Sequence, residues 1–250
     1  MTWMAGVDEA GRGPCLGPLV VAAFALPQSD LALLVENGVN DSKQLNHDER
    51  RRIADWLRTE GVERGWLMQV HASSALDVDL AMQVSNLTSH EIDIFARLLN
   101  EVVRTGPVDD DLSGGTLALD ACQVDAHRFG ERVASRLTDW PWDDWSIDSR
   151  HHHDETNPAV SAASVLAKVE RDELVRALES ELGSPIGSGY PNDPATKEAL
   201  PALVDGSEPW EHLRWGWATI AEAWKESHGS EVPLRPLDGE FRPGQQRLSM

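Results

Sequence analysis

The sequence has no long apolar run and very little cysteine. The roughly 18 consecutive apolar residues that a membrane-spanning helix needs occur nowhere in the chain. The first residues lead into an expected strand without the basic and apolar regions of a secretory signal. The two cysteines are too few for a disulfide framework. We therefore expect a cytoplasmic protein with no membrane partner, in a reducing compartment.

Basic residues are also scarce. The chain has 42 acidic and 22 basic residues, which gives a formal net charge of −20, and only four of the basic residues are lysines. Such a charge repels a polyanion at long range, so composition alone argues against nucleic-acid binding. A carboxylate-rich, lysine-poor surface also suits a salt-rich cell interior, where screening removes most of the repulsion beyond about 8 Å.

The apolar pattern predicts one α/β domain, in which strands alternate with helices. The expected strands are residues 3–8, 19–26, 66–72 and 116–120, and the expected helices include 80–104, 158–182 and 215–226. Asn157 before Pro158 is typical of an N-cap followed by the first helical residue. We assign residues 1–228 to the domain and predict a flexible tail over 229–250, which has three prolines after residue 230 and little apolar periodicity.

Acidic residues follow several of these elements. Asp8 and Glu9 end the first strand, Asp120 ends a later strand, and Asp154 precedes the helix at Asn157. Carboxylates beside an apolar sheet are costly unless they are paired or bound to a metal, and Mg²⁺ prefers oxygen ligands. Because adjacent strand residues point to opposite faces, Asp8 and Glu9 can share a site only if the strand breaks at Glu9. From spacing alone, solvated strand ends are the simpler interpretation.

Several segments, in a fixed order, resemble the signatures of the ribonuclease HII family. They are DEAGRGP at 8–14, NDSKQL at 40–45, LDA at 119–121, VSAASVLAKVERD at 160–172, GSGYPNDP at 187–194 and RWGWAT at 214–219. The resemblance covers about residues 3–225 and is nearer to the archaeal enzymes and the eukaryotic catalytic subunit than to the usual bacterial form.

The resemblance implies a ribonuclease H-like mixed sheet flanked by helices, with a C-terminal helical extension. It also implies an endoribonuclease that cleaves the RNA strand of RNA–DNA hybrids and cuts at ribonucleotides embedded in duplex DNA. The implied cofactor is Mg²⁺ or Mn²⁺ in a two-metal site, and the implied products carry 5′-phosphate and 3′-hydroxyl ends. Such an enzyme would serve DNA replication and ribonucleotide excision repair, and we expect a monomer.

The family's metal-binding carboxylates correspond to Asp8, Glu9, Asp120 and Asp154. Asp154 is fixed only by its distance from the serine–alanine segment at 161–164, because residues 150–153 do not match the family well. The resemblance therefore predicts these four side chains as the catalytic set.

The substrate-binding residues implied by the resemblance are Gly11, Arg12, Gly13, Lys43, Lys168 and Tyr190. The glycine–arginine–glycine backbone would lie against the ribose 2′-hydroxyl, the group that distinguishes RNA from DNA. Tyr190, the single tyrosine, would read that hydroxyl and stack at the ribonucleotide junction.

Other positions leave alternatives open. We favour a phosphate contact for Lys43, whereas a structural pairing suits Lys168 equally well; Arg171 matches a basic position near the active site. Three consecutive histidines at 151–153 cannot easily face one ion, although one of them could move a proton.

Two rival functions also fit the fold. The first is a catalytically silent subunit that binds hybrids, which the intact carboxylates argue against. The second is a two-metal DNA resolvase, which the glycine–arginine–glycine segment and Tyr190 argue against.

Overall fold

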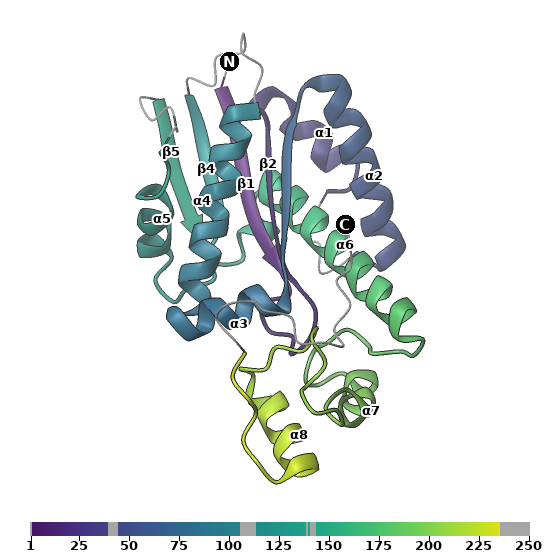
Figure 1. The fold of residues 1–250 in the computed structure, drawn as a ribbon. Coiled ribbons are helices and arrows are strands. Elements are labelled where there is room, and N and C mark those ends of the chain that lie inside the picture. Colours follow the sequence, from purple (N-terminus) through teal and green to yellow (C-terminus); the bar gives the residue numbers. More distant parts are fainter. Residues whose placement is uncertain (1, 40–44, 106–113, 139, 141–143, 236–250) are drawn as a thin grey trace. The chain divides into compact units, whose positions relative to one another are not determined.

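Five strands form one mixed sheet in the computed structural model, which describes residues 2–39, 45–105, 114–138, 140 and 144–235 (Figure 1). The strands are β1 (Thr2–Ala10), β2 (Leu19–Pro27), β3 (Leu67–Ser73), β4 (Gly114–Asp120) and β5 (Asp144–Arg150). Their order is β3-β2-β1-β4-β5. β1 is antiparallel to β2 and parallel to β4, and β4 is parallel to β5. The predicted α/β class with a mixed sheet is confirmed.

Helices flank this sheet and continue beyond it toward the C-terminus. They are α1 (Leu31–Glu36), α2 (His47–Arg64), α3 (Ala75–Val84), α4 (Leu87–Thr105), α5 (Ala126–Ala134), α6 (Pro158–Leu182), α7 (Pro194–Leu203) and α8 (Ala218–His228). The predicted start of α6 is confirmed, because the Asn157 Oδ1 accepts hydrogen bonds from the backbone N–H groups of Ala159 (2.9 Å) and Val160 (3.3 Å).

Two predictions about elements were wrong or incomplete. The single helix expected over 80–104 is two helices: Ser74 and Asp77 form a capping box that starts α3 earlier, and the chain leaves helical geometry at Ser85 before α4. β5 was not predicted, because this edge strand is mostly half-buried or exposed and therefore lacks an apolar run.

The described chain divides into two compact units. Among the described residues, unit 1 comprises those within 2–12, 19–72 and 87–173, and unit 2 those within 13–18, 73–86 and 174–235. The assignment of residues 1–228 to one catalytic domain stays a prediction. Among the described helices, none combines the length and apolar character needed to cross a membrane.

Unit 1 holds the sheet and the helices that cover it. Figure 1 shows α4 and α5 in front of the sheet and α6 behind it. α4 and α5 meet through Phe95 and Phe129, whose ring centroids lie 5.4 Å apart in an edge-to-face arrangement. On the other side Gly6 of β1 lies directly against the α6 backbone at Ala159. The central strand is thus packed on both faces.

Unit 2 has its own hydrophobic core, which includes Leu16, Leu213 and Trp224. Arg235 falls in the predicted tail, yet it is only 6% exposed and its Nε donates to the Asp79 carboxylate at 2.6 Å. The described part of that tail, residues 229–235, therefore ends in a buried ion pair within unit 2. Residues 236–250 lie outside the described part of the chain.

Candidate active site

The first strand runs past the two predicted carboxylates. β1 continues to Ala10, which pairs with Val20 of β2, so the expectation that the strand ends at Asp8 and breaks at Glu9 was wrong. The reason is that β2 is buried along its whole length and keeps β1 in register. Asp8 is only 3% exposed, accepts a hydrogen bond from the Glu9 backbone N–H at 2.7 Å and another from the Ser164 hydroxyl of α6.

The structure brings the four predicted carboxylates into one electrostatic cluster within unit 1. Burial, followed by the charges of Glu9 and Asp120, holds the pKa of Asp8 well above its usual range. Burial and then Asp120 raise the pKa of Glu9 to about 7, against an opposing effect of Arg12, and Asp154 adds to the rise. The neighbouring carboxylates thus make Asp8 and Glu9 harder to ionise in the absence of a cation.

Asp154 lies in a 3₁₀ turn, His153–Glu155, just before α6. It is buried, and the Lys168 Nζ lies 3.8 Å from its Oδ2. The contact places Lys168 beside a predicted catalytic carboxylate. A structural pairing of this lysine is therefore present, while its predicted contact with substrate stays a prediction.

The three histidines make separate contacts rather than one cluster. The backbone N–H of His153 donates to the Asp120 Oδ1 at 2.8 Å. The two ring nitrogens of His151 lie 2.9 Å from the Ala121 carbonyl oxygen and 3.1 Å from that of Val124. His153 thus orients the Asp120 carboxylate, and His151 contacts the backbone of the segment that follows Asp120.

Two residues beside Glu9 were not predicted for the site. Glu91 of α4 is 0% exposed and forms an ion pair with Arg12, and the Cys122 Sγ donates a hydrogen bond to the Glu91 Oε2 at 3.1 Å. Burial, followed by the charge of Glu9, raises the pKa of the Cys122 thiol to about 12. Glu91 precedes Phe95 by four residues and so lies on the buried face of α4; an acid on an apolar face was the signal that could have found it.

The glycine–arginine–glycine segment spans the end of one unit and the start of the other. Gly11 has φ +88°, a conformation that favours glycine, and Arg12 donates to the Thr88 hydroxyl at 3.2 Å as well as pairing with Glu91. In unit 2, a Cβ added to Gly13 would lie 3.5 Å from the Cε1 of Tyr190. Tyr190 is 46% exposed, so much of its ring surface is open to a ligand.

Two further basic residues, Lys43 and Arg171, were predicted to lie near the substrate or the active site. Lys43, predicted to contact phosphate, lies outside the described residues. Arg171 is only 5% exposed, so most of its side chain is enclosed by protein.

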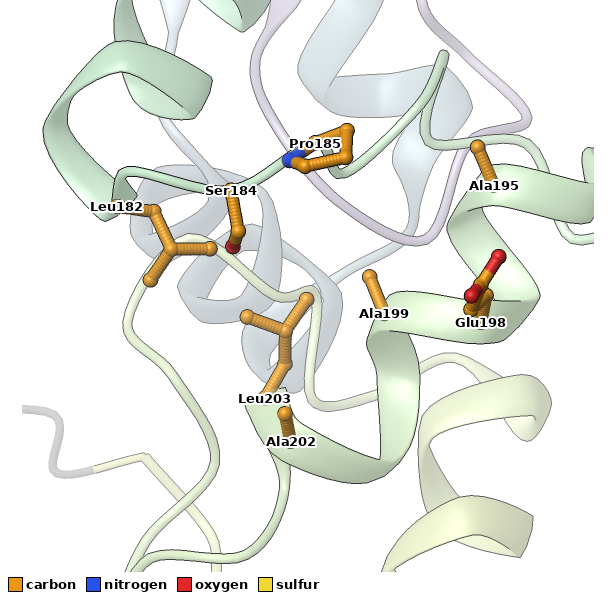
Figure 2. A pocket seen from close by; sticks show the side chains of 8 residues that line it. All are labelled: Leu182, Ser184, Pro185, Ala195, Glu198, Ala199, Ala202 and Leu203. Carbon is orange, nitrogen blue, oxygen red and sulfur yellow. The ribbon is translucent and has the colours of Figure 1, made fainter.

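A pocket in unit 2 is chemically different from this cluster. Figure 2 shows its lining, which is mostly small or apolar and consists of Leu182, Ser184, Pro185, Ala195, Glu198, Ala199, Ala202 and Leu203. Glu198 is the single ionisable side chain among them. The pocket therefore lacks the grouped carboxylates that metal-dependent hydrolysis requires, and we assign it no catalytic role.

The donor set around β1 suits divalent cations with oxygen ligands. Asp8 and Asp154 are buried carboxylates, and the Glu9 Oε2 is buried without a hydrogen-bond partner in the described part of the chain. Buried acids with raised pKa values and an unsatisfied oxygen are stabilised when a cation neutralises them. The residues present therefore fit Mg²⁺ or Mn²⁺.

Comparisons with known proteins agree on one family. The family model described as "Ribonuclease HII" matches residues 5–220. A ribonuclease HII from Thermococcus kodakarensis is 35% identical over 96% of this chain and 98% of the relative. The crystal structure of ribonuclease H2 from Pyrococcus horikoshii OT3 superposes with a TM-score of 0.76 at 29% identity, covering 92% of this chain and all of the other.

A more distant structure shows the fold alone. The crystal structure of Bst-RNase HIII in complex with Mn²⁺ has a TM-score of 0.71 at 20% identity, and the match covers 92% of this chain and 71% of that one.

Proposed function

The chain belongs to the ribonuclease HII family of metal-dependent nucleases that act on RNA in RNA–DNA hybrids, and from that premise we propose that it also cuts at ribonucleotides embedded in duplex DNA. Cleavage would leave 5′-phosphate and 3′-hydroxyl ends. The observation that carries the proposal is the carboxylate cluster at the end of β1, in which burial and neighbouring charges raise the pKa values of Asp8 and Glu9.

We assign the binding of Mg²⁺ or Mn²⁺, as a pair of ions, to Asp8, Glu9, Asp120 and Asp154. When bound, the cations supply Lewis-acid stabilisation of the attacked phosphate and lower the pKa of water. The chain's own residues orient these ligands: the Ser164 hydroxyl and the Glu9 backbone N–H hold Asp8, and the His153 backbone N–H holds Asp120.

Selection of the ribonucleotide is assigned to the backbone at Gly11, Arg12 and Gly13 and to the side chain of Tyr190. The positive φ of Gly11 and the missing Cβ of Gly13 let main chain approach a ribose closely. The exposed ring of Tyr190 offers a stacking surface and a hydroxyl donor. Lys43 and Lys168 would contact phosphates.

A substrate panel tests the proposal. Matched duplexes would contain no ribose, one ribose or an RNA strand, and cleavage would be followed with Mg²⁺ and with Mn²⁺. We expect cutting of the second and third duplexes and an intact first one. Cleavage of the all-DNA duplex would favour a resolvase, and binding without cleavage in either metal would favour a silent subunit.

Membership of the family is also the basis for a proposal about location, oligomeric state and cellular process. We propose a cytoplasmic monomer that acts in DNA replication and ribonucleotide excision repair. Size-exclusion chromatography with light scattering would measure the oligomeric state, and a mass of two chains would contradict the monomer.

A further inference from the structure

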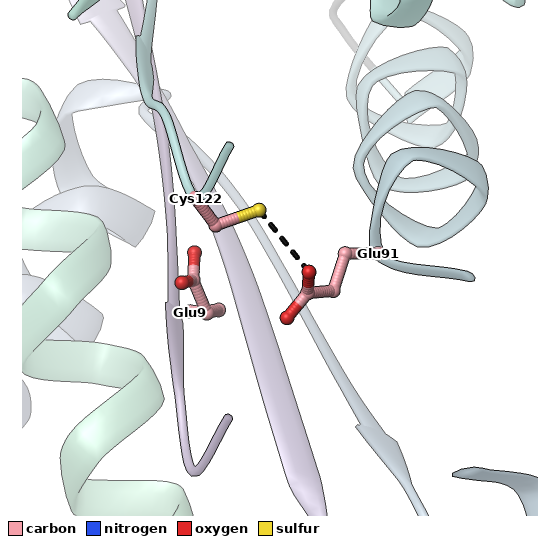
Figure 3. A group of neighbouring side chains, drawn as sticks. All are labelled: Glu9, Glu91 and Cys122. Carbon is pink, nitrogen blue, oxygen red and sulfur yellow. Dashed lines mark hydrogen bonds between the residues drawn. The ribbon is translucent and has the colours of Figure 1, made fainter. Parts of the chain in front are cut away.

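A thiol and two carboxylates converge beside the predicted catalytic cluster. Figure 3 shows Glu9 from β1, Glu91 from α4 and Cys122 from the segment after β4, with their ends turned toward one another. One ligand atom from each lies within 4.8 Å of the other two. All three residues belong to unit 1.

The group contains acceptors that the surrounding protein does not satisfy. The Glu9 Oε2 and the Glu91 Oε1 are both buried and have no hydrogen-bond partner among the described residues. Arg12 and the Cys122 thiol both donate to the other oxygen of Glu91, its Oε2. Glu91 is 0% exposed, and a buried carboxylate oxygen without a partner is destabilising. A cation between the two carboxylates would satisfy both oxygens.

The mixture of donors indicates which cation. Mg²⁺ and Ca²⁺ take oxygen ligands and gain little from sulfur, whereas Zn²⁺ binds thiolate and carboxylate together in a tetrahedral arrangement. Zn²⁺ bonds sulfur at about 2.3 Å and carboxylate oxygen at about 2.0–2.2 Å, so its ligands lie about 3.5 Å apart. The three atoms, which lie within 4.8 Å of one another, would have to move closer to reach that spacing.

Charge balance is also favourable. Two carboxylates and one thiolate around a divalent ion leave one net negative charge, and the Arg12 guanidinium paired with Glu91 offsets it. The thiol proton of Cys122 leaves for solvent when sulfur binds the ion, and water can fill the fourth position.

We propose that Glu9, Glu91 and Cys122 form a second cation site that selects Zn²⁺ and, when occupied, inhibits the enzyme. The inhibition rests on the proposed function, because it arises from the one residue that the two sites share. Glu9 bound to Zn²⁺ is withdrawn from the predicted Mg²⁺ or Mn²⁺ ligands. The zinc site itself does not depend on that function.

Direct binding is tested with Co²⁺ as a spectroscopic substitute for Zn²⁺. The full chain, freed of metal, is titrated with Co²⁺ in the absence of Mg²⁺, because Mg²⁺ would compete for Glu9. We expect a near-ultraviolet thiolate-to-cobalt charge-transfer band that Zn²⁺ abolishes by displacement. Cys122→Ser should lose the band, while the matched control Cys15→Ser, which removes the other cysteine, should keep it. A band absent from the parent, or retained in Cys122→Ser, overturns the proposal.

Inhibition is measured in the same variants. Zn²⁺ is titrated into Mg²⁺-dependent cleavage of a hybrid, and each variant is normalised to its own rate without Zn²⁺. We expect Cys122→Ser and Glu91→Gln to raise the half-inhibitory Zn²⁺ concentration at least tenfold and Cys15→Ser to leave it unchanged. Equal inhibition of all three variants overturns the regulatory role. Melting curves identify any variant that fails to fold, in which case Cys122→Ala replaces Cys122→Ser.

The two proposals fail separately. A cobalt band without cleavage of any ribose-containing duplex would contradict the proposed function and leave the zinc site standing. Cleavage without the band would do the reverse.

Discussion

Neighbouring residues Asp8 and Glu9 have different surroundings although they share one charge cluster. Asp8 is held by Ser164 of α6, whereas Glu9 lies beside Glu91 of α4. This follows from the alternation of side chains along an unbroken strand. Asp120, at the end of the neighbouring parallel strand, acts on both. One strand end therefore offers carboxylates toward both layers of helices.

Replacing Asp8 by Asn should abolish cleavage while the protein still folds. The neutral amide is a poorer ligand, and because loss of a residue that merely orients a metal ligand costs about 10–100-fold, loss of the ligand should cost at least that much. Without metal the variant should melt higher than the parent, since one repelling charge is gone. Cleavage rates and melting temperatures in EDTA test this, with the exposed Asp205→Asn as control. A parental rate in Asp8→Asn would contradict its role as a metal ligand.

The raised pKa of Glu9 predicts a pH-dependent loss of stability in the metal-free protein. The pKa of Glu9 is 4.5 in the unfolded chain and about 7 in the folded chain. Between these two pH values the unfolded chain has lost the Glu9 proton, whereas the folded chain keeps it. Stability contributed by this group is therefore present at low pH and lost as pH rises through that window. The melting temperature of Glu9→Gln minus that of the parent should grow from pH 4.5 to 7 and then level off.

The control for this experiment is added Mn²⁺. A bound cation favours the ionised carboxylate, so the pH-dependent difference should shrink. A difference that is constant across the window would show that burial does not perturb Glu9.

Two substitutions of Tyr190 measure the contributions of its hydroxyl and of its ring separately. Tyr190→Phe removes one hydroxyl and should cost about 0.5–1.5 kcal/mol in kcat/KM on a duplex with one ribonucleotide. Tyr190→Ala should lose roughly 1–3 kcal/mol more, because the ring is removed. Melting curves control for folding. If both variants cleave like the parent, Tyr190 has only a structural role.

At the scale of elements, the contact between β1 and α6 holds the site together within unit 1. A Cβ on Gly6 would lie 2.3 Å from the Ala159 carbonyl carbon and 2.4 Å from the Val160 nitrogen. Both are backbone atoms at the start of α6, so they cannot rotate away. The same helix carries Ser164 and Lys168, which contact Asp8 and Asp154. Close packing here therefore sets the position of the residues that hold the carboxylates.

Gly6→Ala should destabilise the fold by an amount at the upper end of about 1–3 kcal/mol, the usual range for overpacking. It should also lower cleavage in the molecules that remain folded, because α6 must shift. Gly183→Ala is the control: its φ is +71° and a Cβ there meets nothing within 4 Å, so only a backbone cost of about 1–2 kcal/mol is expected. Urea melts and cleavage rates measure both effects, and normal activity per folded molecule in Gly6→Ala would contradict the positioning role of α6.

At the scale of the whole molecule, the net charge of −20 opposes the binding of a polyanion. Basic residues such as Arg12 and Lys168 are few, and both already pair with carboxylates. Long-range repulsion by the remaining acids is screened at lower salt than short-range attraction at the site. Affinity for nucleic acid should therefore depend on salt differently from that of a basic nuclease.

We predict a cleavage optimum at raised monovalent salt. Screening first removes the repulsion and also relieves self-repulsion among the 42 acidic residues, so the melting temperature should rise as well. Cleavage rates and melting curves over a salt series measure both. Activity that falls monotonically from the lowest salt, with an unchanged melting temperature, would show that the acidic surface does not influence binding.

The sequence by itself determined the family, the α/β class and the start of α6, because each can be recognised from short motifs or local apolar patterns. The glycine-containing signature at 8–14 and the Asn157 cap are local signals of this kind. The resemblance carried by such motifs explains why Asp8, Glu9, Asp120 and Asp154 could be named in advance. Their role as metal ligands remains a prediction.

The tertiary structure decided what depends on distant pairing. β1 continues past Asp8 because β2 pairs with it, and β5 is a strand because β4 lies beside it rather than because of its own pattern. Glu91 lies 82 residues from Glu9 in the sequence, and only the packing of α4 brings its carboxylate to Glu9 and Cys122. A short window of sequence indicates the secondary-structure propensity of a segment. The residues that bury a side chain and shift its pKa are set only by tertiary packing.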